Sequence, residues 1–169
     1  MNVGAVAVLL SVSGLFLSGC SPASRASAAM SPSVVTPSGI IRSQSDLQRY
    51  LAVTAKSGSP LNALSSRARD RFISGLTFNA KGVTGFHYGD LQSELTASQI
   101  YNVLRLFGLE KDVQIIPNVR VETTADRRVI SSLVDPEDST GDGSDYKGYY
   151  CVQRATCAPN KDTICTSNC

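Results

Sequence analysis

The stretch LTFNAKGVTGFHY, residues 76–88, decides the fold class, because the spacing of apolar residues changes there from helical to alternating. Its two arms, residues 76–78 and 83–88, are rich in Thr, Val and Phe and flank the turn sequence NAKG, residues 79–82. Glycine at the last turn position supplies the positive φ that tight turns need. We therefore expect a short β-hairpin in a chain that is otherwise mostly helical.

Helical patterns precede the hairpin. One begins at Ser45 and ends at Gly58, and the next covers residues 60–74 and ends at Gly75. A serine stands at the start of each, and a proline occupies the first turn of the second; both are typical of helix starts. Glycine is the residue that most often follows a helix. The sequence thus predicts two helices here.

Further helical patterns follow the hairpin. The sequence TASQ, residues 96–99, has the form of a capping box, and apolar residues at helical spacing continue from it to Gly108. Residues 113–116 look like a strand that Pro117 breaks. Residues 119–123 alternate as an edge strand would, and residues 126–134 favour a short helix.

The amino-terminal segment combines an uncharged apolar run, Val3 to Leu17, with the sequence LSGC at residues 17–20. This tetrapeptide resembles the lipobox of bacterial lipoproteins. The resemblance implies a signal peptide over residues 1–19, cleavage before Cys20, a diacylglycerol on its thiol and acylation of its amino group. Ordinary secretion, with cleavage at the small residues 26–28, and an uncleaved anchor are the alternatives.

The segment that follows Cys20 is rich in Ser, Ala and Pro up to residue 39. Such a composition buries too little apolar surface to fold, so we expect a flexible tether over residues 20–39. Ser21 stands where enteric-type lipoproteins retained in the inner membrane have aspartate. The expected location is therefore the cell envelope, with a lipid anchor in the outer membrane.

The other four cysteines are an even set near the carboxyl end, spaced C-x5-C-x7-C-x3-C: Cys151, Cys157, Cys165 and Cys169. Zinc sites favour closer pairs, and exported proteins favour disulfides, so we expect two disulfides and no metal. Four cysteines allow three connectivities. The turn sequence PNKD, residues 159–162, favours Cys157–Cys165 nested inside Cys151–Cys169.

These patterns divide the chain into an α+β body at residues 40–134, an acidic linker at 135–145 and a cysteine-rich tail at 146–169. The predicted fold class is α+β: a small, helix-dominated domain with a short hairpin and a disulfide-stapled C-terminal module. We expect the tail to depend on its disulfides, because it has few apolar residues of its own.

Other residues with functional chemistry lack the companions that a site would need. His87 is the only histidine, and no partner for catalysis is evident. The acidic linker lacks the residue order of a calcium loop, and its S-x-x-K sequence lacks the other motifs of penicillin-binding enzymes. Arg67 and Arg71 share a helix face with Asp70 and can pair with it or, together with Arg69, meet an anionic surface.

The function that these features favour is a non-enzymatic envelope lipoprotein whose tethered domain binds another protein. Its expected partners are the membrane, through the lipid at Cys20, and an envelope or extracellular protein; no cofactor is expected. The near-neutral net charge of +2 argues against nucleic acid. A released antibacterial or inhibitor peptide in the tail, or an envelope hydrolase, are the alternatives. In layout the chain resembles bacteriocin-related lipoproteins of the fulvocin C-related group, from which no functional residue is transferred.

Overall fold

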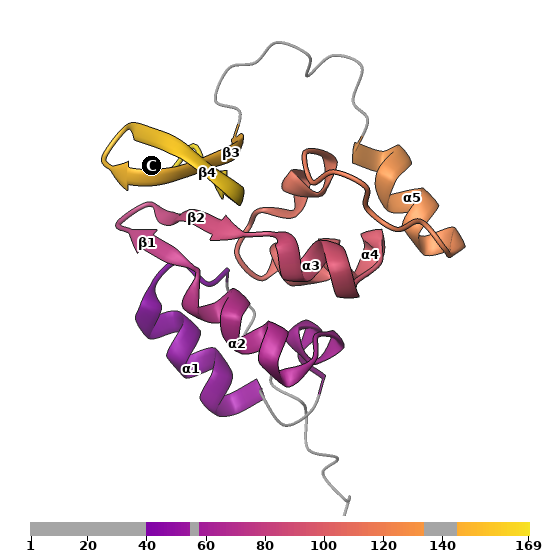
Figure 1. Ribbon diagram of the computed structural model, residues 1–169. Coiled ribbons are helices and arrows are strands. Elements are labelled where there is room, and N and C mark those ends of the chain that lie inside the picture. Colours follow the sequence, from indigo (N-terminus) through magenta and orange to yellow (C-terminus); the bar gives the residue numbers. More distant parts are fainter. Residues whose placement is uncertain (1–39, 55–57, 134–144) are drawn as a thin grey trace, which may run out of the picture. The chain divides into compact units, whose positions relative to one another are not determined.

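Two β-hairpins far apart in the sequence form one antiparallel sheet (Figure 1). The computed structural model describes residues 40–54, 58–133 and 145–169. The first hairpin is the one predicted at residues 76–88, and the second lies in the cysteine-rich tail. The strands are β1 (Thr77–Asn79), β2 (Gly82–His87), β3 (Tyr146–Gln153) and β4 (Thr156–Cys165), in the order β1-β2-β4-β3.

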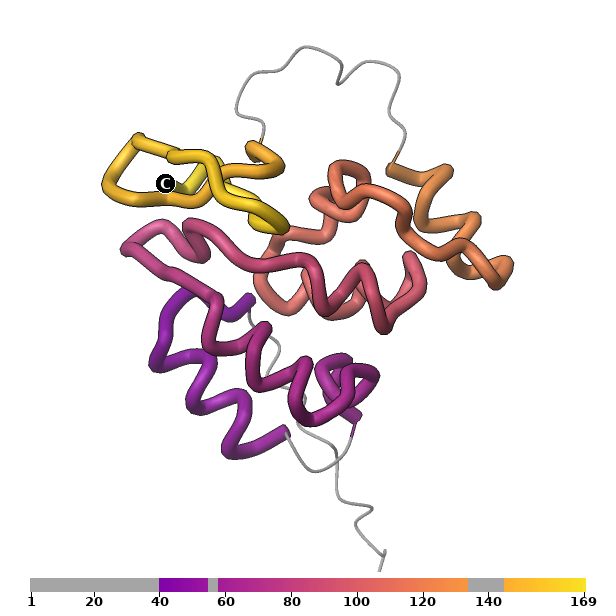
Figure 2. The backbone as a smooth tube through the Cα atoms, in the orientation of Figure 1, coloured from indigo at the N-terminus to yellow at the C-terminus, as the bar shows by residue number. Residues whose placement is uncertain are grey.

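Helices make up most of the remaining described chain, which confirms the predicted α+β class (Figure 2). The helices expected from residue 45, at residues 96–108 and at 126–134 are present within a few residues of their predicted ends. The helical elements are α1 (Gln44–Thr54), η1 (Pro60–Ala63), α2 (Ser66–Ser74), α3 (Gly89–Glu94), α4 (Ala97–Arg105), η2 (Glu110–Gln114) and α5 (Thr124–Leu133).

Several predictions fall outside the described residues. These are the signal peptide, the lipidation site Cys20, the tether up to residue 39 and all of the acidic linker except Asp145. Within the described ranges, no helix is long and apolar enough to cross a membrane.

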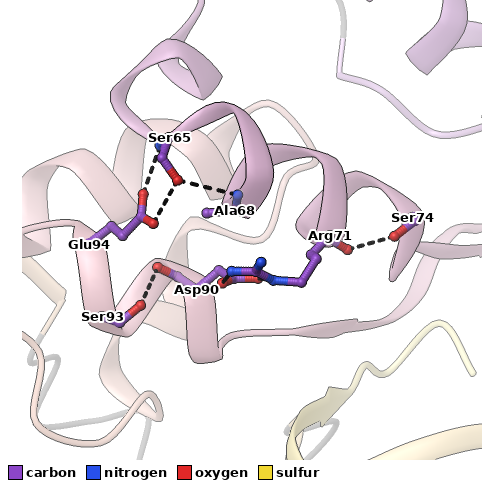
Figure 3. A network of polar contacts seen from close by, with 7 residues as sticks. All are labelled: Ser65, Ala68, Arg71, Ser74, Asp90, Ser93 and Glu94. Atoms are coloured by element: carbon purple, nitrogen blue, oxygen red, sulfur yellow. Dashed lines mark hydrogen bonds and ion pairs between the residues drawn. The ribbon is translucent and has the colours of Figure 1, made fainter.

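The single helix predicted at residues 60–74 is wrong, because the chain breaks at Leu64 and Ser65. Both residues have extended backbone angles, with ψ of 148° and 153°. The Ser65 hydroxyl accepts a hydrogen bond from the Ala68 backbone N–H at 3.3 Å, so it caps α2 as a new helix. Glu94 of α3 accepts hydrogen bonds from the Ser65 backbone N–H and hydroxyl, which holds the break in place (Figure 3).

Both strands predicted between residues 113 and 123 are also wrong. Val113 and Ile116 are buried three residues apart, which suits the tight 3-10 turn of η2 and its end. The segment at residues 119–123 forms only an isolated bridge, in which the Arg120 carbonyl accepts from the Ala97 N–H at 2.9 Å. Alternation alone does not make a strand, because this segment has no sheet edge beside it.

The tail shares its core with the body of the chain. Strand β4 pairs with β2, and the register places the fully buried Ile164 opposite the fully buried Phe86. Phe86 packs edge-on against Phe72 of α2, with ring centroids 6.3 Å apart. The described residues of the body, 40–54 and 58–133, and those of the tail, 146–169, therefore belong to one sheet and one hydrophobic core.

Two buried carboxyl groups have pKa values that are shifted in opposite directions. Asp112 in η2 is 6% exposed, and burial, together with a hydrogen bond to Asp145 and the charges of Asp145 and Glu110, raises its pKa to about 9. Burial also acts to raise the pKa of Asp126, but hydrogen bonds outweigh it and the pKa lies well below its ordinary value. The lowering comes first from the side chain and backbone N–H of Ser98, and then from the side chains of Thr123 and Thr96.

Replacing Ile164 with alanine tests the shared core. Ile164→Ala should lower the free energy of unfolding by about 2–5 kcal/mol, since it empties a buried site. Urea denaturation of the disulfide-bonded protein measures this loss. Val152→Ala on β3 is the control, because Val152 is 58% exposed; it should change stability by no more than about 0.5 kcal/mol. Equal losses in the two variants would contradict a core that includes the tail.

The raised pKa of Asp112 predicts that stability falls as pH rises from 5 to 8. Between its ordinary pKa of 3.8 and the folded value of about 9, the folded state binds a proton that the unfolded state has released. Asp126 acts oppositely only as pH falls below about 4, outside this window. Urea denaturation at both pH values should show the slope, and Asp112→Asn should flatten it. A slope unchanged in Asp112→Asn would contradict this assignment.

Candidate interaction surface

The four tail cysteines form two disulfides, Cys151–Cys169 and Cys157–Cys165, with Cα atoms 5.7 and 6.1 Å apart. The nested pairing that the sequence favours is therefore confirmed. The Sγ atoms of Cys151, Cys165 and Cys169 lie within 4.8 Å of one another, so the two disulfides are packed together. Thiolates rather than disulfide sulfurs bind metals, so in this oxidised state the cluster serves as a covalent staple.

The sequence PNKD, residues 159–162, which suggested this pairing, does not form the turn of the hairpin. The hairpin reverses at Arg154 and Ala155, where Ala155 has a φ of +58°. Residues 159–162 instead lie within β4, where the register jumps from Tyr149↔Pro159 to Lys147↔Ile164. The turn sequence thus forms a bulge, and the Cys157–Cys165 disulfide closes it.

Strand β3 is an outer strand of the sheet, and it presents large apolar side chains to solvent. Tyr146, Tyr149 and Val152 are 56%, 41% and 58% exposed. The rings of Tyr146 and Tyr149 contact each other edge to face, 6.3 Å between centroids. Within the described part of the chain, β3 pairs with β4 alone. Its other edge and its exposed side chains suit the addition of a strand from a partner.

A cleft of about 510 Å³ lies between the β1–β2 turn and the end of β3. We call it the hairpin cleft. The Cys151–Cys169 disulfide lines it, and among the side chains that line it those of Lys81 and Arg154 are charged. It is lined by Phe78, Asn79, Ala80, Lys81, Thr84, Cys151, Val152, Gln153, Arg154 and Cys169.

His87 lies in a second hollow, which also contains Ser74, Asp90 and Asp162. His87 is exposed, and its imidazole lies beside Gly75 and the ring of Tyr150, whose centroid is 6.5 Å away. Ser74 donates its hydroxyl hydrogen bond to the Arg71 carbonyl, 2.9 Å away. Among the described residues, none forms a nucleophile–histidine hydrogen bond in this hollow.

Two of the three arginines of α2, Arg69 and Arg71, form hydrogen bonds within the fold, whereas Arg67 is exposed. Arg71 makes two hydrogen bonds to the Asp90 carboxylate of α3, one of them from Nε at 3.1 Å (Figure 3). The hydrogen bond to Asp90 raises the pKa of the Arg71 guanidinium. Arg69 donates to the Asn62 side chain at 3.2 Å. The pairing of Arg71 is thus with Asp90, and not with Asp70 as the helix spacing suggested.

The hairpin cleft and the exposed edge of β3 were not evident from sequence. The turn at residues 79–82 was predicted, but its neighbour across the cleft comes from residues 151–154, which only the sheet order places beside it. No protein family, curated protein or solved structure matches the chain. The function therefore has to be inferred from this surface.

Proposed function

We propose that this chain is a non-enzymatic lipoprotein of the bacterial cell envelope that binds another envelope or extracellular protein through β3. The lipobox-like sequence before Cys20 supports export and a lipid anchor, which we place in the outer membrane. The two disulfides are compatible with an oxidising compartment outside the cytoplasm. The tethered domain then presents its binding surface at a distance from the membrane.

The observation that carries this proposal is the exposed outer edge of β3. An edge strand offers unpaired main-chain groups to a second strand, and exposed aromatic residues are common anchors in protein interfaces. Tyr146, Tyr149 and Val152 lie on one strand that the disulfide at Cys151 holds in place. A partner that adds a strand here buries apolar area and completes hydrogen bonds at once.

The alternative of a peptide released from the tail is less well supported. Release of residues 146–169 would remove Ile164 from the core and leave β2 without its β4 neighbour. The hydrolase alternative would use His87. The serine and one carboxylate of its hollow, Ser74 and Asp90, are both hydrogen-bonded to Arg71. Binding through β3 needs neither cleavage nor a catalytic group.

A photo-crosslinking amino acid at position 149 tests the proposed surface in cells that make the full chain. Benzoylphenylalanine in place of Tyr149 should give a discrete cross-linked species, since the exposed edge of β3 contacts the partner. Mass spectrometry of that species should identify an envelope or extracellular protein.

In the same strain, Cys20→Ala should leave an unprocessed precursor that lacks the mass of diacylglycerol.

The matched control places the same amino acid at Val53 of α1, which is 65% exposed and lies outside the sheet. That position should give no cross-link to the same protein. Equal cross-linking from both positions, or none from position 149, would count against β3 as the binding surface. Normal processing of Cys20→Ala would count against the lipid anchor.

A further inference from the structure

The two walls of the hairpin cleft are fixed to each other by the segment Thr166–Cys169. On one side, the Asn168 side chain donates to the Val83 carbonyl at 3.1 Å, and the Thr166 hydroxyl donates to the same carbonyl at 2.6 Å. On the other side, Cys169 is joined to Cys151 of β3, and its carbonyl accepts from the Ala155 N–H at 2.7 Å. The cleft is therefore preorganised, which lowers the entropic cost of binding.

The charged side chains that line the cleft are both cations. Lys81 stands on the β1–β2 turn and Arg154 at the end of β3, so each wall contributes one cation. Neither side chain forms an ion pair with a described residue, whereas Arg49, Arg71 and Arg120 each do. An anionic group in the cleft would be attracted from both walls.

The remaining lining favours a peptide as the source of the anion. Phe78, Ala80 and Val152 offer apolar contact beside the two cations. Val152 is 58% exposed, so the strand that carries the proposed binding surface also contributes apolar area to the cleft. An extended peptide that lies in the cleft can place acidic side chains between the cations and apolar ones on Val152.

We propose that the hairpin cleft binds an acidic, extended peptide segment of the partner protein. This inference rests on the proposed binding function and specifies the chemistry of the partner. Lys81 and Arg154 select for carboxylates, and the apolar side chains of the lining, Phe78, Ala80 and Val152, provide the adjoining contact. The Cys151–Cys169 disulfide keeps the two walls at a fixed separation.

A titration with defined peptides tests this chemistry on the full chain in a neutral detergent. The probe is the peptide Ac-EVEVEV-amide, followed by NMR chemical shifts of backbone amides; Ac-QVQVQV-amide and Ac-KVKVKV-amide are its neutral and basic counterparts. The acidic peptide should cause saturable shifts at residues 78–84 and 151–154, and the basic peptide none. The double variant Lys81→Glu with Arg154→Glu should weaken binding about tenfold, because two attractions become repulsions.

The matched control makes the same charge change outside the sheet, with Arg67→Glu on α2 and Arg128→Glu on α5, both exposed, and should keep the affinity within about twofold. Equal binding of the basic peptide, equal loss in both double variants, or no saturable shift would overturn the proposal. Binding only to phosphatidylglycerol vesicles would overturn it in favour of a lipid surface. A cross-link from position 149 that persists in the cleft variant would leave the broader proposed function standing while the acidic-peptide inference fails.

Discussion

Antiparallel pairing of β4 with β2 is the interaction on which the rest of the structure depends. It places Ile164 opposite Phe86 in the core, and the N–H of Tyr88 donates to the Asp162 carbonyl at 2.9 Å. Thr166 extends the contact by donating its N–H to the Thr84 carbonyl at 3.0 Å. Without this pairing, which we call the seam, β3 would have no sheet to border, because β4 is the described strand with which it pairs.

The disulfides stabilise the part of the β3–β4 hairpin that lies beyond its pairing with β2. Near its tip, the β3–β4 hairpin has no partner in β2, whose pairing with β4 covers only residues 163–165 of that strand. Cys151–Cys169 ties this tip to the segment that hydrogen-bonds β2, and Cys157–Cys165 closes the bulge in β4. The core thus holds the base of the hairpin, while covalent bonds position its exposed edge and the cleft beside it.

Local signals in the sequence predicted local structure well. The Asn79 side chain accepts from the N–H groups of Lys81 and Gly82, which is why the turn was evident, and Gln99 accepts from the Thr96 N–H as a capping box requires. The predictions that were wrong concern segments whose structure depends on partners distant in the sequence. Residues 119–123 alternate like a strand but adjoin no sheet, and Ser65 starts a second helix with support from Glu94. The hairpin cleft needs the order β1-β2-β4-β3, which no local pattern encodes.

Native-state hydrogen exchange at the β2–β4 seam tests the central claim most directly. The amides of Tyr88 and Thr166 cross the seam, whereas the amide of Ile100 is hydrogen-bonded within the start of α4. If tail and body form one cooperative unit, the free energies of opening at these amides should agree within about 1 kcal/mol. A free energy of opening at the seam several kcal/mol below that at Ile100 would mean that the seam opens by local fraying. That result would contradict a core shared by the tail and the body.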